Sequence, residues 1–184
     1  MSDSQTPESQ SPGAAPATPP DRTEHEPDLL VLTQYVKDLS FENPNAPVIF
    51  GQTQSQPKIS ISVDVRVNAI QEKLAEVILA LKVEAMVNDK NAFLVELEYA
   101  GIANLTKEMT PEESERKFLI EVPSMLFPFA RAIIAGLSRD GGFMPFLMTP
   151  IDFELLHRQR QARAAAQAAQ SAAAGETSEE GAAS

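Results

Sequence analysis

The stretch from residue 58 to 68, KISISVDVRVN, constrains the fold of this chain more than any other. Its apolar residues fall at every second position, with serine, aspartate and arginine between them. Because successive side chains of a strand point to opposite faces of a sheet, this alternation predicts a strand with one buried and one solvated face. Such a strand requires neighbouring strands and a layer that covers its apolar face.

Three other segments predict the neighbouring strands. Residues 73–86 and 92–99 alternate in the same way, and the letters NDKN at 88–91 supply the turn of a hairpin between them. Residues 29–36, LLVLTQYV, form a short apolar run whose Tyr35 and β-branched residues favour a strand. Short connections and strict alternation predict that the strands are antiparallel.

The covering layer is predicted to be helical. The letters TPEE at 110–113 combine a threonine N-cap, a proline at the first helical position and a capping box. Helical spacing continues to a stop at Gly141 and Gly142. Pro123 and Pro128 are expected to break or kink this helix, because each removes a backbone donor.

A last helix is expected to start at a cap formed by Thr149 or Asp152. The resulting fold class is α+β, a four-stranded antiparallel sheet with a kinked helix and a C-terminal helix on one face. We expect this domain to span residues 28–162. Residues 1–27 hold six of the fourteen prolines and no aromatic residue, which predicts a disordered arm. Residues 163–184 are expected to form a flexible, acidic tail whose alanines extend the helix by a turn or two.

Composition and charge exclude several classes of protein. The net charge of −11 argues against nucleic acid or an anionic membrane as the main partner, because both attract basic patches. It fits a solvated acidic surface or a basic partner. The chain has no cysteine, which excludes disulfides and thiolate metal sites. Its start does not resemble a signal peptide and no stretch approaches a membrane span, so we expect a cytoplasmic protein.

Candidate catalytic groups are sparse. The two histidines, His25 and His157, have no partner at ligand spacing, and no glycine-rich phosphate loop is present. The serines lack a nearby base and a nucleophile-elbow motif. We therefore expect no enzyme, no cofactor and no metal site.

Large apolar residues gather instead in two irregular segments, 37–50 (KDLSFENPNAPVIF) and 143–150 (FMPFLMTP). The first mixes turn-forming asparagine and proline with phenylalanine and valine, which predicts a long connection lying against a sheet or helix. Each of these apolar residues alone could complete a core or an oligomer interface. Together they indicate a surface for apolar guests, because Phe and Met make adaptable contacts.

The letters KDLSFENPNAP at 37–47, followed by the alternating strand, closely resemble SecB, the bacterial protein-export chaperone family. The letters LFPFAR at 126–131 and the run from 145 to 153 resemble the same family. The resemblance covers about residues 29–157, with the segments in the family's order. Two features depart from it, because the proline-rich arm is longer and the tail is rich in alanine rather than glutamine.

The resemblance implies an ATP-independent holdase that keeps secretory precursor proteins unfolded in the cytoplasm and delivers them to the SecA ATPase. It also implies a homotetramer built as a dimer of dimers. For SecA binding it implies Asp38, Glu42, Leu94 and Glu96. For the client groove it implies Phe41, Pro44, Pro47, Val48, Phe50, Phe143, Met144, Phe146 and Phe153. The alternation separately places Leu94 and Glu96 on one solvent-facing side of their strand.

Two alternatives stay open at this point. An adaptor or oligomeric structural module of the same fold would use all of these apolar segments in subunit contacts. A small-molecule enzyme would need a polar pocket, which the sequence does not provide. A holdase, unlike either alternative, suppresses aggregation of a denatured client without ATP.

Overall fold

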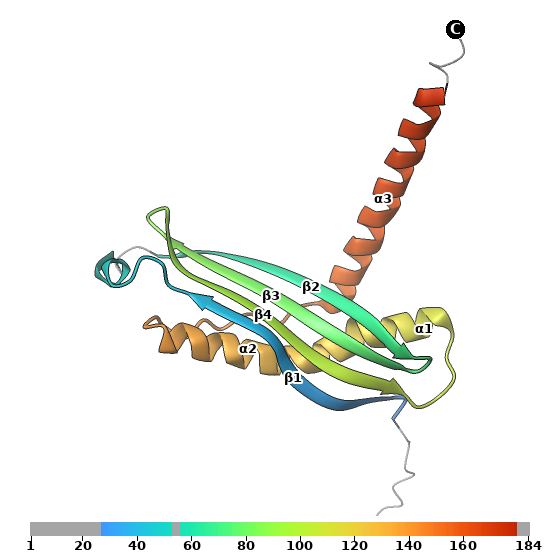
Figure 1. Cartoon of the computed structure of the whole chain (residues 1–184), viewed down its shortest axis with the longest axis horizontal. Coiled ribbons are helices and arrows are strands. Elements are labelled where there is room, and N and C mark those ends of the chain that lie inside the picture. Colours follow the sequence, from blue (N-terminus) through green and yellow to red (C-terminus); the bar gives the residue numbers. More distant parts are fainter. Residues whose placement is uncertain (1–26, 53–55, 180–184) are drawn as a thin grey trace, which may run out of the picture.

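The structure, a computed structural model, describes residues 27–52 and 56–179. The predicted disordered arm at 1–27 therefore lies outside the described residues, except for Pro27. One sheet carries helices on a single face, and a long helix projects from it (Figure 1). The elements are β1 (Leu29–Glu42), η1 (Val48–Gln52), β2 (Lys58–Gln71), β3 (Leu74–Val87), β4 (Lys90–Leu105), α1 (Pro111–Arg116), η2 (Lys117–Glu121), α2 (Val122–Asp140) and α3 (Phe153–Glu179).

The sheet has four antiparallel strands in the order β1-β4-β3-β2, as the alternation predicted. The chain crosses from β1, at one edge, to β2, at the other, and then returns through two hairpins. The turn between β3 and β4 is the predicted one, where Asn88 and Asp89 have φ angles of 49° and 59°. Asparagine and aspartate tolerate this left-handed region better than other non-glycine residues, so the turn can be tight.

The prediction that residues 37–50 form one long connection is wrong in its first half. Residues 37–42 continue β1 and pair with β4 as far as Glu42. The register of this pair shifts between Val31 and Thr33 and again between Val36 and Asp38. Each extra residue interrupts the alternation that marks a strand in a sequence, so β1 looked shorter than it is. Only the second half, after Glu42, is a crossover connection.

The core lies between the sheet and α2. On the face of the sheet that carries the helices, the central strands β3 and β4 place side chains that are almost fully buried. These side chains are Val77, Leu79, Leu81, Val83, Val95 and Leu97, and Leu126 and Ile134 of α2 are buried with them. Fully burying one such side chain stabilises the fold by roughly 1.5–3 kcal/mol.

A single helical segment, Pro111–Asp140, covers this face through α1, η2 and α2. The predicted capping box is present, with Glu113 N donating to Thr110 Oγ1 at 3.2 Å and Thr110 N donating to Glu113 Oε2 at 2.9 Å. Pro123 and Pro128 do not end the helix. The π-helical turn η2 lies just before Pro123, and such wider turns are common where a helix is kinked.

The same segment is long and apolar enough to cross a membrane by length and composition, contrary to the expectation that no stretch would be. Its packing argues for a different role. Leu126 lies against Gly101 of β4, at a position where a β-carbon on Gly101 would come within 3.0 Å of the leucine. The segment therefore has the contacts of a helix that covers a sheet.

α3 starts at the predicted cap, because Leu155 N donates to Asp152 Oδ1 at 2.8 Å. It continues to Glu179, several turns further than expected, and points away from the sheet (Figure 1). Only its first turns cover the domain, where the Phe153 side chain is buried against Phe127 with ring centroids 6.2 Å apart. The C-terminal helix thus contributes its beginning, not its length, to the core. The flexibility of residues 163–184 stays a prediction.

On the opposite face of the sheet, which we call the outer face, Glu76 of β3 accepts hydrogen bonds from side chains of β1 and β2. Lys37 Nζ lies 2.7 Å from each carboxylate oxygen, Tyr35 Oη lies 2.5 Å from Oε1, and Asn68 Nδ2 lies 2.9 Å from Oε2. These bonds, that of Lys37 first, lower the pKa of Glu76 to about 2. The carboxylate thus joins β1, β2 and β3 across the outer face.

This cluster predicts a specific pH dependence of stability. A carboxylate with a lowered pKa stabilises the fold above about pH 4.5, and the contribution is lost as pH falls towards 2. We expect Glu76→Gln to cost about 1–2 kcal/mol at pH 7 and to flatten the change in the free energy of unfolding between these pH values. Urea unfolding of wild type and Glu76→Gln between about pH 2 and pH 7 measures this free energy. Glu72→Gln, at an exposed position, is the control. If the free energy of unfolding changes with pH in the same way for wild type and Glu76→Gln, Glu76 is not the source of the pH dependence.

Candidate binding surfaces

The four residues predicted for SecA binding all lie on the outer face. In the β1–β4 pair, Glu42 is opposite Leu94 and Asp38 is opposite Glu98, while Glu96 is opposite Ser40. Cross-strand partners point to the same side of a sheet, so Asp38, Glu42, Leu94 and Glu96 share one face. Leu94 and Glu96 are on the same side of β4, as the alternation predicted.

The outer face holds more acidic residues than the sequence analysis singled out. We define the acidic face as the carboxylates of Asp38, Glu42, Asp64, Glu84, Glu96 and Glu98. Part of it is hollowed into a depression of about 320 Å³. Asp64, Glu84 and Glu98 were missed because their proximity follows from the register between strands, which alternation within one strand does not give.

Cations neutralise one side of the acidic face. Arg66 lies 2.5 Å from Glu98 and 3.8 Å from Asp64, and Arg160 of α3 reaches Asp64 around the edge of the sheet. Lys82 pairs with Glu96 at 2.6 Å. Within residues 27–52 and 56–179, no ion-pair partner lies beside Asp38, Glu42 or Glu84. These three acids are therefore the ones most available to the Lys or Arg side chains of a partner.

The residues predicted for the client groove do not form one continuous surface. The crossover and the segment after α2 do meet, because Phe50 and Phe143 have ring centroids 5.4 Å apart. Phe93 of β4 joins them, at 5.1 Å from Phe143 and 6.1 Å from Phe41. Phe41, Phe50 and Phe143 thus share an aromatic cluster, and its central ring, Phe93, was placed by the sequence only as a buried strand residue.

Two glycines and two asparagines fix this aromatic cluster in place. A β-carbon on Gly141 would lie 2.2 Å from Phe41 Cζ, and Gly142 has a φ of +89° with Phe50 close to it. Asn43 donates to Gly141 O at 3.3 Å. Asn45 donates to Asn91 O at 2.9 Å. The asparagines were expected to bond to their own turn, but they attach the crossover to α2 and β4 instead.

The other predicted groove residues divide by exposure. Phe153 lies in the core beside α2, so it does not join the cluster. Phe146 is half-buried, and its backbone N donates to Ser138 Oγ at 2.8 Å. Pro44, Pro47, Val48 and Met144 are exposed. The exposed members flank the aromatic cluster at the end of the sheet where η1 and the end of α2 meet (Figure 1).

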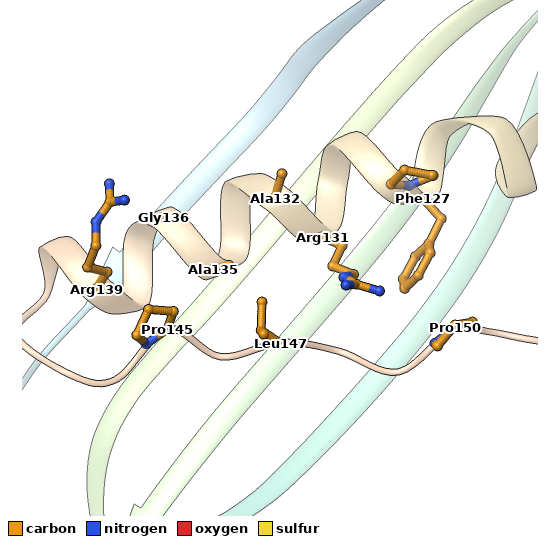
Figure 2. A pocket seen from close by; sticks show the side chains of 10 residues that line it. Phe127, Arg131, Ala132, Ala135, Gly136, Arg139, Pro145, Leu147 and Pro150 are labelled. Atoms are coloured by element: carbon orange, nitrogen blue, oxygen red, sulfur yellow. The ribbon is translucent and has the colours of Figure 1, made fainter.

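A second apolar surface, which we call the α2 groove, was not predicted from the sequence. This groove of about 710 Å³ lies between α2 and residues 145–150 (Figure 2). Its lining is Phe127, Pro128, Arg131, Ala132, Ala135, Gly136, Arg139, Pro145, Leu147 and Pro150. Leu147 projects towards α2 between Pro145 and Pro150 (Figure 2). Nearby, Met125 and Phe129 are exposed on α2.

A signal for the α2 groove was present in the sequence. Residues 125–136, MLFPFARAIIAG, are apolar around most of the helix, whereas a helix with one buried face needs only one apolar stripe. Large side chains and small ones, Ala132 and Gly136, share the outward side of α2. Such a mixture allows close approach of another polypeptide.

In the described part of the chain, no group of three or more His, Cys, Asp or Glu residues is placed to hold a metal.

Comparison with known proteins gives consistent matches. A family model described as preprotein translocase subunit SecB matches residues 22–164. The chain is 47% identical over 132 residues to the protein-export protein SecB of Rhodospirillum centenum, covering 72% of this chain and 79% of that protein. It is 50% identical over 139 residues to the protein of the same name from Parvibaculum lavamentivorans, covering 75% and 82%.

One solved structure shares the fold at low sequence identity. It is the Mycobacterium tuberculosis SecB-like chaperone Rv1957 in complex with a peptide from the HigA1 antitoxin. The TM-score is 0.59 at 12% identity, and the match covers 67% of this chain and 91% of that one. At this identity the similarity concerns the fold alone.

Proposed function

The chain belongs to the SecB family of protein-export chaperones, and on that premise we propose that it carries unfolded precursors in the cytoplasm and transfers them to SecA. It is a chaperone and not an enzyme, as the family is. The observation that carries the proposal is the separation of two kinds of surface. The acidic face lies on the outer side of the sheet, whereas the aromatic cluster that joins the crossover to residue 143 is built on the opposite side of β1 and β4, at Phe41 and Phe93.

Clients bind to the exposed apolar residues around the aromatic cluster. Val48 is the first residue of the short helix η1, and Met144 and Leu147 project from the irregular segment after α2. Side chains in such short and irregular segments can adjust to different sequences. Phe and Met contacts of this kind suit a binder of many polypeptides. A few such anchors supply useful affinity even after the entropic cost of ordering a flexible client. No nucleotide takes part in this step.

SecA docks on the acidic face. Asp38, Glu42, Leu94 and Glu96 are the contact residues that the family resemblance implies, and they are neighbours in the sheet register. A regular sheet holds these side chains in fixed positions, so a basic segment meets a preformed pattern of charge. Because the clients occupy other segments, the chaperone can hold a client and SecA together.

The chain assembles as a homotetramer, a dimer of dimers, and its apolar exposure supports this. β1 is an edge strand with exposed apolar side chains, and an open edge can pair with a second copy. The outward side of α2 carries Met125 and Phe129 beside the small residues Ala132 and Gly136. Helices with small residues can approach closely, so α2 offers a second contact between subunits.

The α2 contact predicts a change of assembly state. The substitution Phe129→Glu places a charge where two copies of α2 would meet, and burying an unpaired charge is costly. We expect this variant to form dimers at concentrations where the wild type forms tetramers. Size-exclusion chromatography with light scattering measures the mass. Ser124→Glu, also exposed on this helix, is the control, and an unchanged tetramer in Phe129→Glu would contradict the α2 contact.

A pull-down tests the proposed function as a whole. The immobilised protein is exposed to a bacterial extract that contains SecA, and the bound proteins are identified by mass spectrometry. We expect SecA together with precursors that still carry their signal sequences. Recovery of folded cytoplasmic proteins without SecA or precursors would favour an adaptor of the same fold.

A further inference from the structure

Lys82 of β3 lies in the middle of the acidic face. Its Nζ is 2.6 Å from Glu96 Oε1, and the two side chains are 51% and 49% exposed. The hydrogen bond to Glu96 raises the pKa of Lys82, and the charges of Glu84 on the same strand and of Glu42 on β1 add to it. The lysine therefore stays charged in any ordinary buffer.

The Lys82–Glu96 pair has little to contribute to stability, because exposed ion pairs are worth little on average. Its position matters more. Glu96 is one of the proposed SecA contacts. Its neighbours on β1, Asp38 and Glu42, have no ion-pair partner in the part of the chain that the structure describes. Glu96 is thus the one contact acid that already has a cation, and it comes from the chain itself.

We propose that Lys82 sets the affinity of the acidic face, because it holds Glu96 in an internal ion pair that a basic segment of the partner must open. This inference rests on the proposed docking of SecA at this face. A partner cation that approaches Glu96 either displaces Lys82 or is repelled by it. The unpaired acids, Asp38, Glu42 and Glu84, accept the partner first, and Lys82 keeps the complex weak enough to release.

A charge-removal pair tests the proposal. Lys82→Met keeps most of the stem and removes the ammonium. Lys107→Met removes a matched cation, because Lys107 pairs with Asp28 at 2.7 Å with exposures of 51% and 45% but lies away from the acidic face. By calorimetry with purified SecA at low salt, we expect Lys82→Met to bind about two- to fivefold more tightly than wild type. Lys107→Met and the conservative Lys82→Arg should bind like wild type.

A double-mutant cycle separates the specific pair from a general effect of charge. If Lys82 acts through Glu96, the gain from Lys82→Met disappears in a Glu96→Gln background. If Lys82 only makes the whole face more positive, the gain is the same in both backgrounds, and the proposal is overturned. If wild type binds SecA and Lys82→Met binds it with the same affinity, this inference alone is overturned. Absence of SecA binding by both proteins overturns the docking site and the inference with it.

Discussion

The substitution Glu96→Lys is expected to weaken SecA binding by about tenfold or more and to leave client binding unchanged. It removes a contact acid and places a second cation beside Lys82, so the outer face repels a basic partner where it attracted one. About tenfold corresponds to ~1.4 kcal/mol, which is a modest loss for a charge reversal inside an interface. Calorimetry with SecA and anisotropy with a labelled unfolded precursor measure the two activities.

A control at a distant ion pair makes this result specific. Glu108 also pairs with a lysine, Lys73, but it follows β4 and is not on the acidic face. Glu108→Lys therefore changes the net charge equally and should leave SecA binding within about twofold of wild type. If Glu96→Lys lowered SecA binding and client binding to the same extent, the two surfaces would have been assigned wrongly.

The second large effect is expected on client binding. The triple variant Val48→Ser, Met144→Ser and Leu147→Ser removes side chains that are 65%, 88% and 64% exposed. Because they are exposed, their loss should barely change the fold. Each contributes up to roughly 1.5–3 kcal/mol when a client buries it fully, so partial burial of three still predicts at least about a tenfold rise in the Kd for an unfolded precursor.

Exposed apolar residues elsewhere provide the matched control for this variant. Val67 and Ile70 are exposed on β2, away from η1 and residues 143–150. The double variant Val67→Ser and Ile70→Ser should keep wild-type affinity for the same precursor, measured by anisotropy. An equal rise in Kd for both variants would mean that clients bind apolar surface without preference for the proposed site.

Elements with unbroken local patterns could be predicted from the sequence. The sequence of β2 alternates without interruption over residues 58–68, Asn88 and Asp89 are suited to a tight turn, and Thr110 with Glu113 forms a capping box. Each of these signals is local, so no other part of the chain is needed to read it. β1 could not be read in full, because its two register shifts displace residues from the alternation.

The candidate surfaces depend on contacts between distant residues, so the sequence predicted them only in part. The family resemblance named Asp38 and Glu96, but the register that brings Glu84 and Lys82 beside them is a property of the sheet. Phe143 packs on Phe50 of the crossover and on Phe93, a residue that strand periodicity places only in a core. The helical spacing of α2 predicts its buried stripe, whereas its second apolar side becomes apparent only where residues 145–150 lie along it.

The length of α3 shows a different limit. Alanines favour a helix, but nothing in their sequence marks where the helix stops, so one or two extra turns were expected and the helix runs to Glu179. The contacts that hold its beginning come from other elements. Arg116 of α1 lies 3.3 Å from Glu154, and Arg160 donates to Val65 O of β2 at 2.8 Å.

The proposed function requires that this chain keep precursors unfolded without nucleotide. A precursor denatured in urea is diluted into buffer that contains no ATP, and its aggregation is followed by light scattering with and without this protein. At equimolar tetramer, we expect scattering to be largely suppressed and the precursor to stay sensitive to protease. If the protein leaves scattering unchanged, it does not act as a holdase.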